Sequence, residues 1–161
     1  SFEGQSTSYF LNNYIKHPNS ILYALDTFEG SIEHNNEEKK SLLNKFKYNI
    51  ELTNKSNQVK IMQNKSLFSL SQLVLQNIKA DLIYIDGSHT ASNVLTDAVL
   101  AWQCCKIGGF IVFDDYLWKG YDSIHNNPKL GIDNFINTFY DKILMDTGWT
   151  SYQQIIKKIK E

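Results

Sequence analysis

The sequence has 161 residues and few cysteines or prolines, with only two of each. The cysteines, Cys104 and Cys105, are adjacent, and the side chains of neighbouring residues diverge too far for an ordinary structural disulfide. The sequence therefore excludes a small secreted scaffold held together by disulfides. We expect the chain to work in a reducing compartment, with the cytoplasm as the simplest case.

The sequence also lacks an excess of charge of either sign. It has 16 Lys and Arg residues against 17 Asp and Glu residues, for a net charge of −1. Proteins that bind nucleic acid usually carry a clear basic excess, so we expect no nucleic-acid partner. The run "KKIK" (residues 157–160) is expected to be a solvated edge rather than a binding patch.

Long apolar runs are absent as well. No stretch reaches the roughly 18 consecutive apolar residues of a membrane span, and no signal peptide is recognisable, so we expect no membrane partner. The length favours one domain with its own core. Because the chain opens on "SFEGQST" without a methionine or a preceding strand, we expect residues 1–161 to be a single, N-terminally incomplete domain of a longer polypeptide.

What the sequence does contain is an alternation of apolar strand-like and amphipathic helix-like segments. Strands are predicted at 20–26, 58–64, 80–86, 108–115 and 151–159. Helices are predicted at 6–16, 37–53, 67–76, 90–106 and 131–144, the first with Ser6 or Thr7 as its cap and the fourth ending at a Gly108–Gly109 C-cap. Such alternation is typical of βαβ units and of an α/β fold with a mostly parallel sheet.

Four acidic residues follow predicted strands, namely Asp26, Asp86, Asp114 and Asp115. In a parallel sheet the carboxyl ends of the strands lie at one edge, where ligands bind. Asp26 has the position of an acid that accepts hydrogen bonds from a ribose, and equally that of a turn cap.

The other three carboxylates form an all-oxygen set that suits Mg²⁺ or a similar hard cation. The alternative is that Asp114 and Asp115 both point into solvent at the start of a loop. His89 lies three residues beyond Asp86. A neutral imidazole there could take a proton from a substrate hydroxyl, or it could simply belong to the start of the next helix. Gly4, followed by Ser6 and Thr7, offers close backbone approach and donors to an anion, or an ordinary capped helix start.

These motifs together resemble a known family. The segments "SFEGQST", "LYALDTFEG", "IYIDGSHTASNVLTDAVLAW" and "GGFIVFDDYLW" are similar, in this order, to those of the class I S-adenosylmethionine-dependent methyltransferases. The branch concerned is the one related to catechol O-methyltransferase and the macrolide-sugar O-methyltransferases. The resemblance covers nearly the whole chain and implies a Rossmann-like, doubly wound sheet whose first strand is missing here.

The resemblance also implies roles for individual residues. Asp86, Asp114 and Asp115 match the metal ligands, and His89, with Asp86, matches the catalytic position. Ser6 matches the contact to the methionine carboxylate, Asp26 the ribose-binding acid and Ser66 an adenine contact. The implied cofactor-binding set is Phe2, Gly4, Ser6, Asp26, Phe28, Ser66, Asp86 and Gly87.

The implied function is Mg²⁺-assisted O-methylation of a small hydroxylated acceptor, with a sugar or glycan favoured over a catechol. Residues 117–130 are expected to form part of the acceptor wall. One alternative is a methyltransferase-like binding or scaffold module without turnover, and another is a metal-dependent or nucleotide-binding enzyme on the same frame. The acceptor and any homo-oligomeric state are left open by the sequence.

Overall fold

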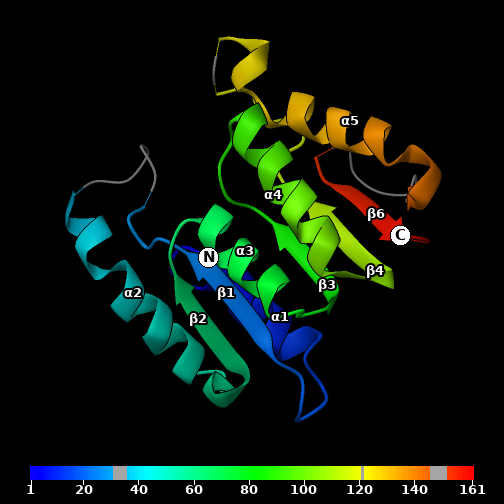
Figure 1. Ribbon diagram of the computed structural model, residues 1–161. Coiled ribbons are helices and arrows are strands. Elements are labelled where there is room, and N and C mark those ends of the chain that lie inside the picture. The colour runs from blue at the N-terminus through cyan, green and yellow to red at the C-terminus, as the bar shows by residue number, and fades with distance from the viewer. Residues whose placement is uncertain (31–35, 121, 146–151) are drawn as a thin grey trace. The chain divides into compact units, whose positions relative to one another are not determined.

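The computed structural model describes residues 1–30, 36–120, 122–145 and 152–161 (Figure 1). The helices are α1 (Gln5–Asn13), α2 (Asn36–Glu51), α3 (Ser66–Leu75), α4 (Ala91–Cys104) and α5 (Pro128–Thr138). The strands are β1 (Leu22–Asp26), β2 (Val59–Gln63), β3 (Ala80–Ile85), β4 (Cys105–Phe113), β5 (Ile143–Met145) and β6 (Gln154–Lys158). Short 3₁₀ turns are η1 (Ser56–Gln58), η2 (Ile124–Asn126) and η3 (Tyr140–Lys142).

The chain divides into two compact units, residues 1–69 and residues 70–161. Each unit has its own sheet and its own hydrophobic core. That residues 1–161 form one domain therefore stays a prediction.

In the first unit β1 and β2 pair in parallel, from Leu22 opposite Val59 to Asp26 opposite Gln63. The apolar side chains of α2 recur about once per turn, and they pack in the core of this unit. That core consists of Leu11, Ala24, Phe28, Leu42, Phe46 and Ile50.

Helix α1 begins differently from the prediction. Gly4 occupies the N-cap position with a left-handed φ of 94°, and no side chain caps the helix, so the expected Ser6 or Thr7 cap is wrong. A Cβ at position 4 would lie 3.1 Å from Cδ2 of Phe46. Glycine is required here both by the backbone conformation and by the close approach to the α2 core.

The second unit contains a four-stranded sheet in the order β3-β4-β6-β5. β3 and β4 are parallel, while β6 runs antiparallel to β4 and β5. Helices α4 and α5 lie side by side in Figure 1 and pack together, and the apolar face of α4 is buried. Gly131 allows this approach, because a Cβ there would lie 2.3 Å from the carbonyl oxygen of Ala91.

Strand β4 starts earlier than predicted. The chain leaves α4 at Cys104 and enters β4 at Cys105, so Gly108 and Gly109 are strand residues and not a helix C-cap. They lie at a register shift, since Ala80 faces Cys105 but Leu82 faces Phe110. Gly108 has a φ of 86°, and the two glycines therefore accommodate a β-bulge.

The run 157–160 is only partly a solvated edge. Lys158 is 1% exposed, and its Nζ donates hydrogen bonds to the carbonyl oxygens of Trp102 and Cys105, each at 3.2 Å. The ammonium group also lies 4.5 Å from the centroid of the Trp102 ring. Lys158 thus binds the carboxyl end of α4, where a cation is favoured by the helix dipole.

The last helix is shorter than predicted. α5 ends at Thr138, and the chain continues through η3 into β5.

Cys104 and Cys105 are free, as expected, and both are buried. Burial raises the pKa of the Cys105 thiol to about 11. None of the described helices is both long enough and apolar enough to cross a membrane.

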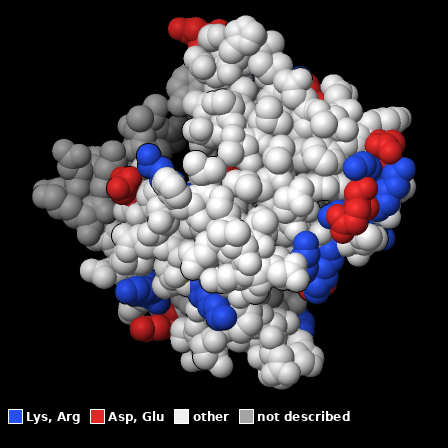
Figure 2. All heavy atoms as spheres, in the orientation of Figure 1, with Lys and Arg blue, Asp and Glu red and all other residues white. Residues whose placement is uncertain are grey.

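The predicted α/β fold class is confirmed. Parallel pairing within β1–β2 and within β3–β4 follows from the βαβ alternation. Among the described residues, β1 pairs only with β2, and β3 pairs only with β4. On the face drawn in Figure 2, basic and acidic side chains lie next to one another, and exposed pairs such as Lys106–Asp81 (2.7 Å) are formed within the second unit.

Candidate active site

The carboxyl ends of β3 and β4 place acidic residues beside each other in the second unit. Asp86 follows the last residue of β3, and Asp114 follows the last residue of β4. The Asp114 N–H donates to the carbonyl oxygen of Ile85 at 3.0 Å, so the parallel ladder continues to the acids themselves. The predicted gathering of these residues at one edge is therefore found within this unit.

Asp86, His89 and Asp115 form a group that could hold a metal ion. One ligand atom of each lies within 4.8 Å of the others. Asp115 adopts a left-handed φ of 56°, an uncommon conformation for a residue with a side chain. This backbone turn brings the Asp115 carboxylate toward the loop that follows β3.

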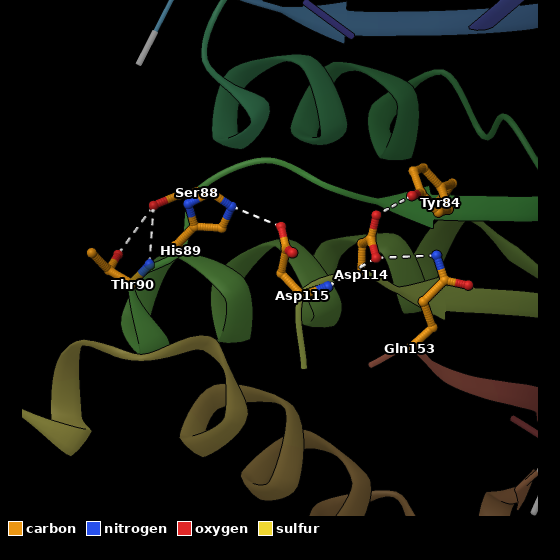
Figure 3. A network of polar contacts seen from close by, with 7 residues as sticks. All are labelled: Tyr84, Ser88, His89, Thr90, Asp114, Asp115 and Gln153. Atoms are coloured by element: carbon orange, nitrogen blue, oxygen red, sulfur yellow. Dashed lines mark hydrogen bonds and ion pairs between the residues drawn. The ribbon is translucent and has the colours of Figure 1, made fainter. Parts of the chain in front are cut away.

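His89 makes a hydrogen bond with Asp115, between Nε2 and Oδ2, at 2.9 Å (Figure 3). An ionised carboxylate only accepts hydrogen bonds, so Nε2 carries the proton in this arrangement. Nδ1 then has the lone pair, and it makes no hydrogen bond with any residue that the structure describes. The imidazole also stacks on the ring of Trp118, with centroids 4.4 Å apart and an interplanar angle of 23°.

Asp114 points away from this group (Figure 3). Its Oδ2 accepts a hydrogen bond from the Tyr84 hydroxyl, and its Oδ1 accepts one from Gln153 Nε2 at 3.0 Å. The Asp115 N–H also donates to Oδ1, at 3.0 Å. Of the three predicted metal carboxylates, the structure groups Asp86 and Asp115, whereas Asp114 is held by its neighbours.

The carboxyl group of Asp86 has an altered acidity, although the residue is exposed. Protein atoms that shield the carboxyl from water raise its pKa, and repulsion by Asp114 adds to this, to a value of about 6. Ionising a carboxyl group next to another carboxylate costs free energy. A bound cation would offset this cost, so such a pair favours cation binding.

The loop between β3 and α4 is held by Ser88. Its Oγ lies 3.2 Å from the Thr90 hydroxyl, accepts the Thr90 N–H at 3.3 Å and accepts Asn93 Nδ2 at 3.0 Å. Gly87 lies beside the buried Asp97, since a Cβ at position 87 would be 3.7 Å from Asp97 Oδ2. The loop that presents His89 is thus fixed to the first turns of α4.

The predicted cofactor residues of the first unit centre on Asp26. Its Oδ2 accepts the Phe2 N–H at 3.1 Å and the Ser1 amino group at 2.8 Å, and its Oδ1 accepts the Phe28 N–H at 2.8 Å. Phe2, Asp26 and Phe28 are therefore brought together.

The remaining candidates have different surroundings. The Phe28 ring is buried against Phe46, with centroids 5.1 Å apart, so its backbone rather than its ring faces Asp26. Phe2 and Gly4 line a hollow of about 500 Å³ between α1 and the end of α2. Ser6 and Ser66 are half-buried at the first turns of α1 and α3.

A family model described as a methyltransferase domain matches residues 1–116 of the sequence. The matched segment includes Gly4, Asp26, Asp86, Asp114 and Asp115. The chain belongs to this methyltransferase family. It is a methyltransferase of the S-adenosylmethionine-dependent class, as the resemblance implied.

Solved structures show the same fold as this methyltransferase. The O-methyltransferase TomG from Streptomyces achromogenes, in complex with SAM, has a TM-score of 0.72 at 13% identity, over 99% of this chain and 70% of TomG. CalS11, a TDP-rhamnose 3′-O-methyltransferase of calicheamicin biosynthesis, has a TM-score of 0.64 at 12% identity, over 96% of this chain and 68% of CalS11.

The mycinamycin methyltransferase MycE, in complex with Mg, SAH and mycinamycin VI, has a TM-score of 0.55 at 13% identity. The match covers 96% of this chain and 48% of MycE, so the chain spans about half of that protein. No curated protein matches the sequence.

Three residues of the methyltransferase site were not found from the sequence. Tyr84 is a half-buried residue within the apolar sequence of β3, and Gln153 lies 39 residues from Asp114. Trp118 falls in the predicted acceptor wall but carried no signal of a contact with His89. A tyrosine two residues before the strand-end acid was the one available hint.

Proposed function

We propose that this methyltransferase transfers the methyl group of S-adenosylmethionine to a hydroxyl oxygen of a small acceptor, a sugar or glycan in preference to a catechol, with the assistance of a divalent cation. The observation that carries the proposal is the group of Asp86, His89 and Asp115, with ligand atoms within 4.8 Å of one another. The solved complexes of TomG with SAM and of MycE with Mg and SAH support it through the shared fold.

The donor chemistry of the site fits a hard divalent cation. Asp86 and Asp115 offer carboxylate oxygens, the ligands that Mg²⁺ and Mn²⁺ prefer. Asp114 is a third candidate from the sequence, and it could contribute only after its side chain leaves Tyr84 and Gln153. A bound cation would supply Lewis-acid polarisation of the acceptor oxygen.

We propose that His89 accepts the proton of the hydroxyl group that is methylated. With Nε2–H donated to Asp115, the lone pair available for a proton is on Nδ1. Asp115 stabilises the imidazolium that results, because the new positive charge lies beside its carboxylate at 2.9 Å. Overall, the acceptor oxygen gains a methyl group, loses a proton to His89, and S-adenosylhomocysteine is released.

The residues around Asp26 are proposed to bind the nucleoside part of the cofactor. The Asp26 carboxylate accepts the Phe2 and Phe28 N–H groups, and its remaining lone pairs can accept further hydrogen bonds from a ribose diol. Gly4, Ser6, Ser66 and Gly87 remain the proposed contacts to the other parts of the cofactor.

Calorimetric titration of S-adenosylhomocysteine, with MgCl₂, MnCl₂ or chelator, tests the cofactor and metal parts of the proposal. We expect micromolar binding of the nucleoside and saturable binding of the metal that Asp86→Asn weakens about 10-fold or more. Asp81→Asn is the matched control, because Asp81 lies on the same strand, is exposed and pairs only with Lys106 among the described residues.

The acceptor is tested with radiolabelled S-adenosylmethionine and three classes of acceptor: deoxysugar nucleotides, catechols and RNA. Methylation of a sugar hydroxyl supports the proposal, and methylation of only a catechol or RNA contradicts its acceptor part. A folded protein that binds neither cofactor nor metal would be the scaffold module instead.

A further inference from the structure

Both contacts that fix the His89 ring come from one short turn. Asp115 meets the edge of the imidazole at Nε2, and Trp118 covers a face of it. The backbone N–H of Trp118 donates to the Asp115 carbonyl oxygen at 2.9 Å. This hydrogen bond closes a four-residue turn, residues 115–118. The left-handed φ of Asp115 sets the direction of this turn.

Tyr116, within this turn, is held by hydrogen bonds to other segments of the second unit. The Tyr116 N–H donates to the Tyr152 carbonyl oxygen at 2.9 Å, and the Tyr116 hydroxyl donates to Asp133 Oδ1 on α5 at 2.8 Å. Lys129 Nζ lies 4.2 Å from the centroid of the Tyr116 ring and binds Asp133 at 2.8 Å. Tyr116, one of the two residues between Asp115 and Trp118, is therefore bound to α5 and to the segment before β6.

The place of the Trp118 ring depends on Gly120. A Cβ at position 120 would lie 2.1 Å from Cη2 and Cζ2 of Trp118. The φ of Gly120 is outside the left-handed region, so glycine is needed here for space and not for backbone conformation. Any side chain at position 120 must displace the indole that stacks on His89.

We propose that Trp118 is a positioning residue for His89, with Gly120 providing the space for its ring. The indole plane fixes the rotation of the imidazole, so that Nε2 faces Asp115 while Nδ1 faces away from it. The expected effect on the reaction rate rests on the proposed function, whereas the expected orientation of the imidazole does not.

The test uses four variants. Gly120→Ala and Trp118→Ala remove the stack, and Trp118→Phe retains an aromatic ring. Lys119→Ala changes the exposed residue that directly follows the turn, and it is the matched control. The first readout is the His89 ring signal in a ¹H–¹³C NMR spectrum of the cofactor-free protein, assigned with His89→Gln. The second readout is kcat and KM for the acceptor.

In the wild type we expect the His89 ring protons to be shifted upfield by the indole ring current. This shift is lost in Gly120→Ala and Trp118→Ala, is retained in part in Trp118→Phe, and is unchanged in Lys119→Ala. We expect kcat to fall about 10–100-fold in the first two variants with KM nearly unchanged, and Trp118→Phe to recover most of the rate.

Two results would overturn the proposal. An unshifted His89 signal in the wild type would show that the stack does not exist in solution. A rise in KM without a fall in kcat would assign Trp118 to acceptor binding instead of positioning. If Gly120→Ala fails to fold, Trp118→Ala decides the same question. Normal S-adenosylhomocysteine binding in every variant separates failure of this inference from failure of the proposed function.

Discussion

The Tyr84 hydroxyl donates a hydrogen bond to Oδ2 of Asp114, so a side chain within β3 holds the carboxylate that follows β4. Gln153 holds the other oxygen of the same carboxylate, from the segment that enters β6. Three neighbouring strands of the second unit therefore meet at one acidic residue. This arrangement explains why Asp114 lies outside the group formed by Asp86, His89 and Asp115.

Tyr84 is expected to stay protonated far into the alkaline range. Burial and the adjacent Asp114 carboxylate hold the pKa of its hydroxyl well above the ordinary value of 10.0. In a spectrophotometric titration of the folded protein, Tyr84→Phe should leave the number of tyrosines that ionise below pH ~11 unchanged. Loss of one ionising tyrosine in that range would contradict the assignment. Because only the unfolded chain ionises Tyr84 near pH ~10, this residue's contribution to stability should decline above that pH.

Asp86 should make the cation-free protein less stable as the pH rises from about 4 to about 6. Its pKa is about 6 in the folded protein against an ordinary 3.8, so the folded state binds the extra proton in this interval. Asp86→Asn should therefore be more stable than the wild type at pH ~7.5, by about 1 kcal/mol after solvent screening, or roughly 2–4 °C in Tm.

Thermal unfolding of wild type and Asp86→Asn across this range, in chelator, measures the effect. The difference in Tm should narrow toward pH ~4, where the carboxyl is protonated in both states. Added MgCl₂ should stabilise the wild type more than Asp86→Asn. A difference in Tm that is the same at all pH values would be evidence against the altered acidity of Asp86.

Lys158→Met should destabilise the protein by about 2–4 kcal/mol, because two buried carbonyl oxygens at the end of α4 lose a charged donor. Lys157→Met is the matched control, since Lys157 is the exposed neighbour on β6 and should change the free energy of unfolding by about 0.5 kcal/mol or less. Urea unfolding of both variants gives the comparison. Equal midpoints for the two would show that the buried ammonium contributes nothing.

Asp26→Asn should weaken S-adenosylhomocysteine binding about 10–100-fold, the loss expected for a hydrogen bond to a charged acceptor. Glu29→Gln, an exposed change three residues away, should leave the affinity unchanged. Calorimetry at pH ~7.5 provides the measurement. Unchanged affinity in Asp26→Asn would return Asp26 to the role of a turn cap for Phe28.

The acids at the strand ends could be predicted from the sequence. The spacing of apolar residues and the alternation of strands with helices can both be recognised within short segments. "DLIYID" and "GGFIVFDD" are each an apolar, strand-like segment that ends in carboxylates, and parallel strands bring such ends to one edge. The α2 and α4 core faces follow from the same periodicity. None of these predictions depends on contacts between residues that are far apart in the sequence.

Other features depend on contacts that the sequence does not record. The burial of Lys158 requires the end of α4, 53 residues earlier, and the orientation of Asp114 requires Gln153, 39 residues later. Gly108 and Gly109 looked like a helix end because glycine serves both in C-caps and in bulges. The left-handed turn at Asp115, and with it the Trp118 stack, has no compositional signal.

Gly131 has no contact with the acidic group, yet it sets where that group can lie. The first residue of α4, Ala91, comes two residues after His89 and meets α5 at position 131, where no side chain fits. A mutant library confined to the residues around His89 would therefore omit a position on which their location depends. In genetic terms, a change at Gly131 would score as a loss of activity although every reactive residue of the site is retained.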